Sequence, residues 1–577
     1  MLKGVGFDVF IICTSNESQA IYWQERLETV KGDVIPEGAT VLAVDEDWEG
    51  GAGNALGTFY AYEKACAKAA AMGINDIHAR LQAGAISIGM YHTAGKGTRL
   101  APLPGAENNN KPGVKLPALL KVGKTMRPMT ILESVIRQTG VYASSRKGRL
   151  SVFWGDQIFI PSVATEYVPK HHIDILCFLG PLPSKEVWER DGLEKYGLIA
   201  VNEYGDAAQV EKVTHGQAVE MLKSLGNVKS VGPSLGSFSI SNVILDQFLE
   251  EFKTELKAKK GKFDTDPHLW MPLSLDETSY VNLMETKGVK RQEAQSHHRR
   301  MKKMLKEFID AGNTNGVTSP LKSKDKNSTS STATDKLGLF GAVDVGTEKY
   351  WWDYGQLRLY HTNVMRLRGT DAESVAMRKF FKISSTGEGE ACRLGSTAVG
   401  GALNSCVSKC DIMEGSIQSS LLCGVNAKHI DATDAILVNV TASGSIVAPP
   451  GSIIYNVAVE GDLKVAEGEV LAGVFDVDGA MCKLKSTTTT DGGKEWKNVV
   501  FGNSRSFEAN YKTNLDTNVT AVEVASQATH AKLGRENSKN LDATESSSRM
   551  FREVALGVGI LALVAGIAMM AVAKGKI

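Results

Sequence analysis

The sequence lacks an excess of charge of either sign. Its 577 residues include 65 lysines and arginines and 65 aspartates and glutamates, so the formal net charge is zero. Proteins that hold nucleic acid through their overall charge need a basic field, because the phosphate backbone is attracted electrostatically. The composition therefore predicts no nucleic-acid partner.

Cysteine is scarce, and its spacing argues against a structural zinc site. The chain has 8 cysteines, and only Cys406 and Cys410 lie close together, as C-x-x-x-C. No second pair of cysteines or histidines follows at zinc-like spacing. We expect no secretory signal peptide, because Met1 to Gly4 lead directly into an apolar run at 7–13. We expect reduced thiols in a cytosolic compartment.

The first 150 residues alternate between patterns of strands and helices. Apolar runs at 7–13, 40–44 and 85–91 predict buried strands, and helices are expected at 17–27 and up to Met72. Such alternation favours an α/β fold with a doubly wound, mostly parallel sheet. Ligands of these sheets bind beyond the carboxyl ends of the strands.

A glycine-rich loop follows the third of these strands. It consists of Thr93, Ala94, Gly95, Lys96, Gly97, Thr98 and Arg99. Glycines allow positive φ angles and close approach of a ligand, and backbone N–H groups in such a loop can cradle phosphate oxygens. The loop matches neither G-x-G-x-x-G nor the P-loop pattern.

The motifs downstream of this loop narrow the range of functions that the loop could serve. Lysines at 111 and 115 precede Leu116-Pro117, a Gly155-Asp156 step follows an apolar run, and Trp351-Trp352-Asp353-Tyr354-Gly355 comes later. Taken in this order, they resemble the sugar-1-phosphate nucleotidyltransferase family over roughly residues 85 to 370. The resemblance implies a Rossmann-like catalytic domain that uses Mg²⁺, a nucleoside triphosphate and a sugar 1-phosphate.

The resemblance also implies roles for individual residues. Asp156 and Asp353 are the expected magnesium ligands, with Asp344 as the runner-up, because Mg²⁺ prefers carboxylate and phosphate oxygens. Arg99 is expected on the triphosphate and either Lys111 or Lys115 on the α-phosphate. Residues 93–98 would bind the nucleotide, with the backbone of Thr93, Ala94 and Gly95 at the base and ribose. The expected sugar-binding residues are Gly197, Glu211, Lys212 and Gly236.

The N-terminal unit has a resemblance of its own. The run 7–19, followed by the glycine-rich segment 50–56, is similar to the start of the fucose-1-phosphate guanylyltransferase branch. The loop at 94–100 departs from that branch, which tends to have Gly-Gly-Tyr-Ser-x-Arg-Leu. The identities of the sugar and of the base therefore stay open.

Composition changes divide the chain further. We expect a catalytic domain at 1–375 with an insertion at about 287–337 that has a charged, helical part and a disordered low-complexity part. A β-helix-like domain is expected at 376–502, because aliphatic residues recur there every several positions with small residues between them, and a β-sandwich is the alternative. A polar linker is expected at 503–553. The uncharged apolar segment 554–572 predicts a transmembrane tail anchor that holds the enzyme on the cytosolic face of a membrane. A buried C-terminal helix is the alternative.

Two other functions are compatible with these patterns. A non-catalytic homologue could sense a nucleotide sugar, although it would be expected to have lost an aspartate or the loop arginine. A β-helix acyltransferase would need a catalytic histidine, and His429 is the only histidine in that region. The sequence also leaves open a homo-oligomer.

Overall fold

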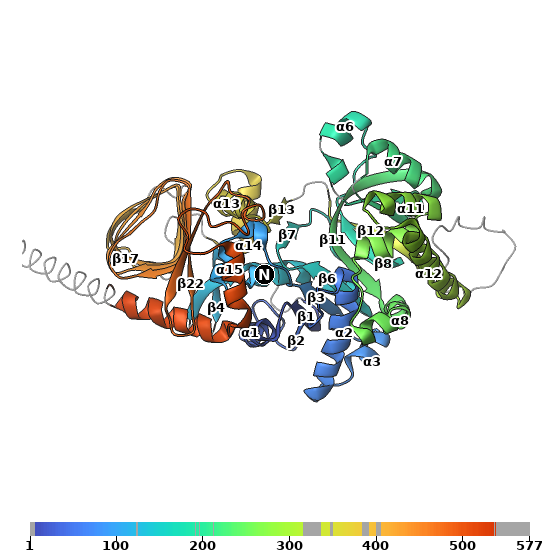
Figure 1. The fold of residues 1–577 in the computed structure, drawn as a ribbon, viewed down its shortest axis with the longest axis horizontal. Helices are drawn as coiled ribbons and strands as arrows, with labels where there is room; N and C mark the ends of the chain where they lie inside the picture. The colour runs from blue at the N-terminus through green and yellow to red at the C-terminus, as the bar shows by residue number, and fades with distance from the viewer. Residues whose placement is uncertain are drawn as a thin grey trace, which may run out of the picture. The chain divides into compact units, whose positions relative to one another are not determined.

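The computed structural model describes residues 6–122, 125–190, 192–195, 197–211, 213–314, 336–346, 350–383, 392–399, 405–535 and 537. The chain forms two compact units (Figure 1). The first comprises Met1–Lys96, Asn110–Gly113 and Thr130–Gly355, and the second comprises Gly97–Asn109, Val114–Met129 and Gln356–Ile577. Neither unit is a single stretch of sequence, whereas the predicted domains were consecutive ranges.

A mixed sheet of nine strands forms the centre of the first unit. Four neighbouring strands run parallel in the order β2-β1-β3-β6, with bounds Thr40–Asp45, Val9–Thr14, Ile88–His92 and Arg149–Trp154. Every residue of β1 and β3 is buried, as expected for strands covered on both faces.

The rest of this sheet corrects the expectation of a mostly parallel sheet. Beyond β6, the strand β11 (Val228–Ser241) pairs antiparallel with β6, with β8 (His171–Cys177) and with β9 (Gly197–Asn202). β10 (Ala207–Glu211) is antiparallel to β9, and β12 (Gly338–Asp344) is parallel to β8. The strand–helix alternation, which enforces parallel crossovers, ends with β6, so the later strands pair without that constraint.

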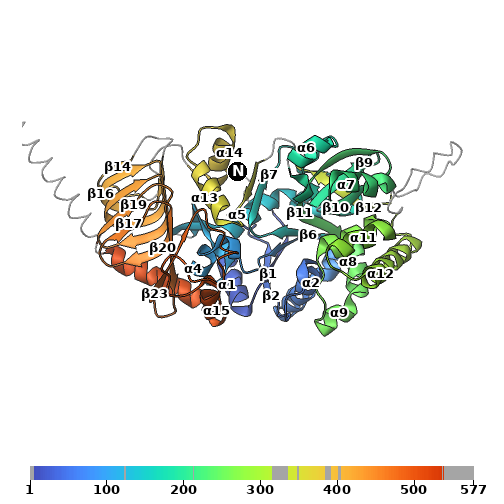
Figure 2. The same cartoon turned by 45° about the horizontal axis from the view of Figure 1, so that its top comes forward.

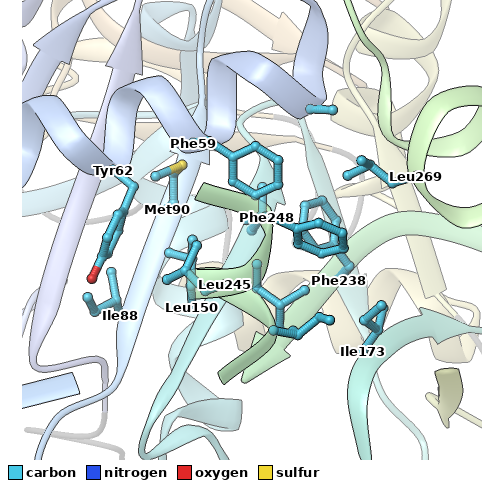
Figure 3. Packing of buried hydrophobic residues seen from close by; sticks show 14 of the residues in the cluster. Phe59, Tyr62, Ile88, Met90, Leu150, Ile173, Phe238, Leu245, Phe248 and Leu269 are labelled. Atoms are coloured by element: carbon cyan, nitrogen blue, oxygen red, sulfur yellow. The ribbon is translucent and has the colours of Figure 1, made fainter. Parts of the chain in front are cut away.

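Helices bury one face of this sheet in a continuous apolar core. α2 (Gly53–Ala71) contributes Phe59 and Tyr62, and α8 (Asn242–Glu251) contributes Leu245 and Phe248. In Figure 3 these side chains lie against residues of β3, β6, β8 and β11, namely Ile88, Met90, Leu150, Ile173 and Phe238. The phenyl rings of Phe59 and Phe248 have centroids 5.4 Å apart. This packing fixes the strand ends that carry the candidate site.

A two-stranded sheet supplements the first unit. β7 (Gln157–Ile160) pairs antiparallel with β13 (Tyr350–Asp353), and Asp353 lies opposite Gln157. The predicted charged helix within the insertion is present as α12 (Arg291–Asp310), and residues 315–335 of that insertion lie outside the described part.

The second unit contains stacked parallel strands, as Figure 2 shows for β14 to β20. Successive rungs place Leu421 of β17 (Leu421–Thr433) beside Ile436 of β18 (Ile436–Ala442), and Ile436 beside Ile453 of β20 (Ile453–Val459). Inward-facing Ile, Leu, Val and Ala side chains form one core. This stacking is the arrangement that the recurring aliphatic residues predict.

The described part of the predicted polar linker is helical. Residues 507–513 form α15 (Phe507–Thr513), and 519–535 form a longer helix. Buried Val522 and Leu533 of that helix pack against Ala458 and Phe475 of the stacked strands. A few apolar residues on one face suffice to attach a mostly polar helix to a core. The low average hydrophobicity of the whole segment does not reveal such a face.

The prediction of a transmembrane tail anchor needs correction. None of the helices in the described part of the chain combines the length and apolarity required to cross a bilayer. The segment 554–572 lies outside the described residues. The structure therefore does not support the transmembrane element of the fold prediction or the location on the cytosolic face of a membrane. An apolar run indicates that a segment avoids water, but it does not identify what covers it.

Candidate functional site

The carboxyl ends of the parallel strands meet at one edge of the first unit. Glu46 directly follows β2, Ser15 follows β1, Thr93 follows β3 and Gly155 follows β6. Thr93 donates two hydrogen bonds to the Cys13 carbonyl oxygen, one from its backbone N at 2.9 Å and one from Oγ1 at 2.8 Å. These bonds tie the start of the glycine-rich loop to the neighbouring strand.

A cavity of about 530 Å³ opens at this edge. The residues that line it all belong to the first unit and come from the strand ends, the residues around the start of α2, the segment 111–112 and the loop at Lys262. They are Glu46, Gly51, Gly53, Asn54, His92, Thr93, Ala94, Gly95, Lys111, Pro112, Trp154, Gly155, Asp156, Gln157 and Lys262. A cavity at the carboxyl ends of parallel strands is the position at which α/β proteins bind ligands.

Two carboxylates and one ammonium group surround a single point beside this cavity. A β-carbon placed on Gly355 would lie 2.9 Å from Asp353 Oδ1, 3.0 Å from Asp156 Oδ2 and 3.8 Å from Lys111 Nζ. Lys111 also forms a short ion pair with Asp156, and their side chains are 19% and 18% exposed. Three residues that are far apart in sequence therefore present their charges to one small volume.

Local backbone contacts hold the two aspartates together. The Gly155 N–H donates to the His92 carbonyl at 3.0 Å, and a β-carbon at Gly155 would be only 3.0 Å from that same oxygen. Tyr354 N donates to the Asp156 carbonyl at 3.0 Å, and Gly355 N donates to Asp353 Oδ1 at 2.6 Å. The Gly155-Asp156 turn and the Asp353-x-Gly355 turn are thus hydrogen-bonded to each other.

The predicted phosphate loop is divided between the two units. Thr93 to Lys96 belong to the first unit, where Gly95 has φ of 128° and its N–H lies 3.4 Å from Ser15 Oγ. Gly97, Thr98 and Arg99 belong to the second unit. Arg99 is exposed on the short helix Thr98–Leu100. Its assignment to the triphosphate stays a prediction.

Lys115, one of the two candidate catalytic lysines, is part of a buried cluster in the second unit. Its ammonium group lies 2.6 Å from both carboxylate oxygens of Glu107, and the two side chains are 11% and 9% exposed. Tyr455 donates its hydroxyl to Glu107 and accepts from the Lys115 N–H at 2.7 Å. These contacts hold Tyr455, a residue of the stacked strands, against the start of β4 (Lys115–Val122). Both carboxylate oxygens of Glu107 and the Lys115 ammonium group are occupied by them.

Glu46 and Lys262 bring a second pair of opposite charges to the cavity. Burial raises the pKa of Glu46, while the Ala52 N–H, which donates to its Oε1 at 2.6 Å, and the Lys262 charge act in the opposite direction. The unit thus supplies a hydrogen-bond acceptor and a cation in addition to the cluster around Asp156. Either group could contact a polar ligand.

His92 is a neutral hydrogen-bonding group in the cavity wall. Burial lowers the pKa of His92 to about 4. The Thr58 hydroxyl donates to the Asn54 carbonyl at 2.7 Å, so it accepts from His92 Nε2 at 2.8 Å. That assignment of the proton to Nε2 leaves Nδ1 as an acceptor. The ring is thus a fixed, uncharged acceptor near pH 7.

We expect acid to destabilise the protein through its buried histidines. Burial lowers the pKa values of His92 and His297 to about 4 and that of His530 to about 3. Since the unfolded chain takes up these protons near pH 6.5, stability is full above that pH and is lost as pH falls toward 4. Urea denaturation at pH 7 and pH 5 should show a loss of about 1–2 kcal/mol per histidine.

The His92→Gln variant provides the control for this pH dependence. Its unfolding free energy should change less between pH 7 and pH 5 than that of the unmodified protein, whatever its stability at pH 7. An unchanged pH dependence would mean that His92 titrates normally in the folded state.

The residues predicted to bind the sugar are placed in three different ways. Gly197 and Glu211 face each other in the register of β9 and β10. Lys212 lies outside the described residues. Gly236 has φ of 71°, and a β-carbon there would lie 2.3 Å from Nε1 of the cavity residue Trp154. Among the described residues of this set, Gly236 alone is connected in this way to the cavity wall, and the sugar assignment stays a prediction.

His429, the residue on which an acyltransferase would depend, lies on β17. Its Nε2 is 3.1 Å from Asp431 Oδ2, and its Nδ1 is 3.7 Å from Glu414 Oε1. All three side chains are at least one-third exposed. A partly exposed histidine between two carboxylates is an ordinary arrangement of surface side chains.

Sequence reasoning missed several cavity residues, notably Glu46, His92, Asn54, Gln157 and Lys262. Glu46 and His92 stand at the ends of predicted strands, so the rule that carboxyl ends converge could have identified them. Lys262 follows no strand or motif, and nothing in its local sequence points to the site. No family model matches the chain, and no curated protein matches it either.

Proposed function

We propose that the protein transfers a nucleotidyl group from a nucleoside triphosphate to a sugar 1-phosphate and releases pyrophosphate. The observation that carries the proposal is the convergence of Asp156, Asp353 and Lys111 around one point, beside a cavity at the ends of parallel strands. The same three residues belong to the ordered sequence motifs that resemble the nucleotidyltransferase family.

The two aspartates are suitable ligands for Mg²⁺. One oxygen of each lies within 3.0 Å of the position that a β-carbon on Gly355 would take, so the two carboxylates are close neighbours. Carboxylates are the ligands that this ion usually takes from proteins, together with water and substrate phosphates. In the described part of the chain, no group of three or more histidines, cysteines, aspartates or glutamates could hold a metal. A two-carboxylate site would rely on the substrate for further ligands. When bound, the ion would withdraw negative charge from the phosphate oxygens.

The reaction demands charge stabilisation more than acid–base chemistry. A phosphate oxygen of the sugar 1-phosphate forms a bond to the α-phosphorus, and the bond to the pyrophosphate leaving group breaks. The nucleophile is already an anion, so no protein group needs to remove a proton. The main obstacle is the negative charge that accumulates on the phosphorus, which a preorganised cation relieves.

Among the two candidate lysines, we assign this role to Lys111. It lies beside both aspartates, and its ammonium group can exchange a carboxylate oxygen for a phosphate oxygen. Lys115 is held by Glu107 and Tyr455. The backbone of Thr93, Ala94 and Gly95 lines the same cavity and is proposed to contact the nucleoside.

The proposal predicts pyrophosphate release with a suitable pair of substrates. Purified protein should be assayed with Mg²⁺ over a matrix of nucleoside triphosphates and sugar 1-phosphates, with each substrate omitted in turn. Release should require both substrates, and the nucleotide sugar should appear in equal amount by mass spectrometry. Binding of a nucleotide sugar without turnover for any pair would favour the regulatory homologue instead.

A further inference from the structure

The ion pair between Lys111 and Asp156 has a consequence for metal binding, if the two aspartates hold a metal as the proposed function requires. Lys111 begins the short helix Lys111–Gly113, and its ammonium group occupies one oxygen of Asp156. The same oxygen is one of the two that face the point beside Gly355. A divalent cation and the lysine therefore compete for Asp156.

The charges around this point would disfavour simultaneous binding of the two cations. The aspartates supply two negative charges, and the lysine already neutralises one of them in a setting where little solvent screens the pair. A divalent cation at Asp156 would stand only a few ångströms from the ammonium group, and like charges at that distance repel strongly away from bulk water. The long lysine side chain can relieve this repulsion by moving to another anion.

A triphosphate that arrives with the metal supplies that anion. Its oxygens carry the charge that Lys111 needs when it leaves Asp156, and they complete the coordination that two carboxylates leave unfilled. We infer that Lys111 acts as a counter-ion that blocks the metal site until a nucleotide arrives. Lys111 thereby makes binding of the metal alone weak and couples metal binding to binding of the triphosphate.

Manganese binding provides a test that does not depend on turnover. Free Mn²⁺ can be counted by electron paramagnetic resonance during titration of the full-length protein, with and without a non-hydrolysable nucleoside triphosphate analogue. The Lys111→Met variant, which removes the charge and keeps an unbranched side chain one atom shorter, should bind Mn²⁺ alone roughly five- to tenfold more tightly than the unmodified protein. The enhancement of Mn²⁺ affinity by the nucleotide analogue should shrink in the same variant.

Lys262→Met is the matched control, because it removes a positive charge from the same cavity without touching the aspartates. Lys262 lines the cavity and interacts electrostatically with Glu46. Its Mn²⁺ affinity should stay within about twofold of the unmodified protein. If Lys262→Met tightens Mn²⁺ binding as much as Lys111→Met, general electrostatics account for the effect and the counter-ion inference is overturned.

Two further outcomes separate this inference from the proposed function. If Lys111→Met and the unmodified protein bind Mn²⁺ equally well, and Asp156→Asn abolishes binding, the metal site stands and the inference about Lys111 fails. If neither protein binds Mn²⁺ even with the nucleotide analogue present, the two-aspartate metal site fails and the inference fails with it. A variant that merely loses structure would bind Mn²⁺ more weakly, which is the opposite of the expected result.

Discussion

Asp156→Asn and Asp353→Asn should each lower kcat for pyrophosphate release by at least about 100-fold, the scale typical of removing a group that stabilises developing charge. Each substitution removes one of the two negative oxygens beside Gly355, while asparagine preserves the shape and the backbone hydrogen bonds of the turn. Initial rates at saturating substrates and Mg²⁺ would measure the effect, with circular dichroism to verify folding.

Asp344→Asn is the appropriate control for these variants. Asp344 ends β12 and accepts hydrogen bonds from the N–H groups of Leu179 and Gly346, at 3.1 and 2.9 Å. It belongs to the same unit and was the runner-up metal ligand by sequence. Its kcat should stay within about threefold of the unmodified protein, because it is outside the pair that faces Lys111. Retention of activity by both Asp156→Asn and Asp353→Asn would remove the metal assignment.

The second large effect concerns stability. Glu107→Gln should lower the free energy of unfolding of the second unit by about 3–5 kcal/mol, the range for removing one partner of a buried ion pair. The reason is that the Lys115 ammonium group, only 11% exposed, would lose the carboxylate that balances it. Urea denaturation followed by far-ultraviolet circular dichroism would measure the loss.

Two variants test the origin of that loss. Adding Lys115→Met to Glu107→Gln should restore much of the stability, because the unpaired charge disappears together with its partner. Glu469→Gln removes the partner of Lys485, which is 44% exposed, and should cost less than about 1 kcal/mol. An unchanged unfolding free energy in Glu107→Gln would show that Lys115 is not held by this pair and would return it to the catalytic candidates.

The local patterns of the sequence identified the elements on which the site is built. Continuous apolar runs predicted the buried strands that became β1, β2 and β3, because a strand covered on both faces has no polar side. Motif order identified Asp156, Asp353 and Lys111 as candidates, and these residues proved to be neighbours. Recurring aliphatic residues likewise predicted the stacked strands of the second unit.

Other questions could be answered only by the tertiary structure. Lys111 and Lys115 are four residues apart and both plausible by sequence, with Lys111 only slightly favoured, but one lies beside the aspartates and the other is held by Glu107. The antiparallel half of the sheet could not be predicted from the sequence either, because strand direction depends on which strands become neighbours. The apolar segment 554–572 suggested a membrane span on hydrophobicity alone, which measures avoidance of water and nothing about the surroundings.

The sequence by itself thus determined where strands end, where glycines permit tight turns and which charged residues stand at those positions. These properties depend on neighbours within a few residues, so they can be read locally. The tertiary structure decided which charges meet: Asp156 with Lys111 across 45 residues, and both with Asp353 almost 200 residues later. Which charged residues become neighbours depends on long-range packing, and so does the presence of Lys262 in the cavity wall. Neither can be inferred from the residues nearby in the sequence.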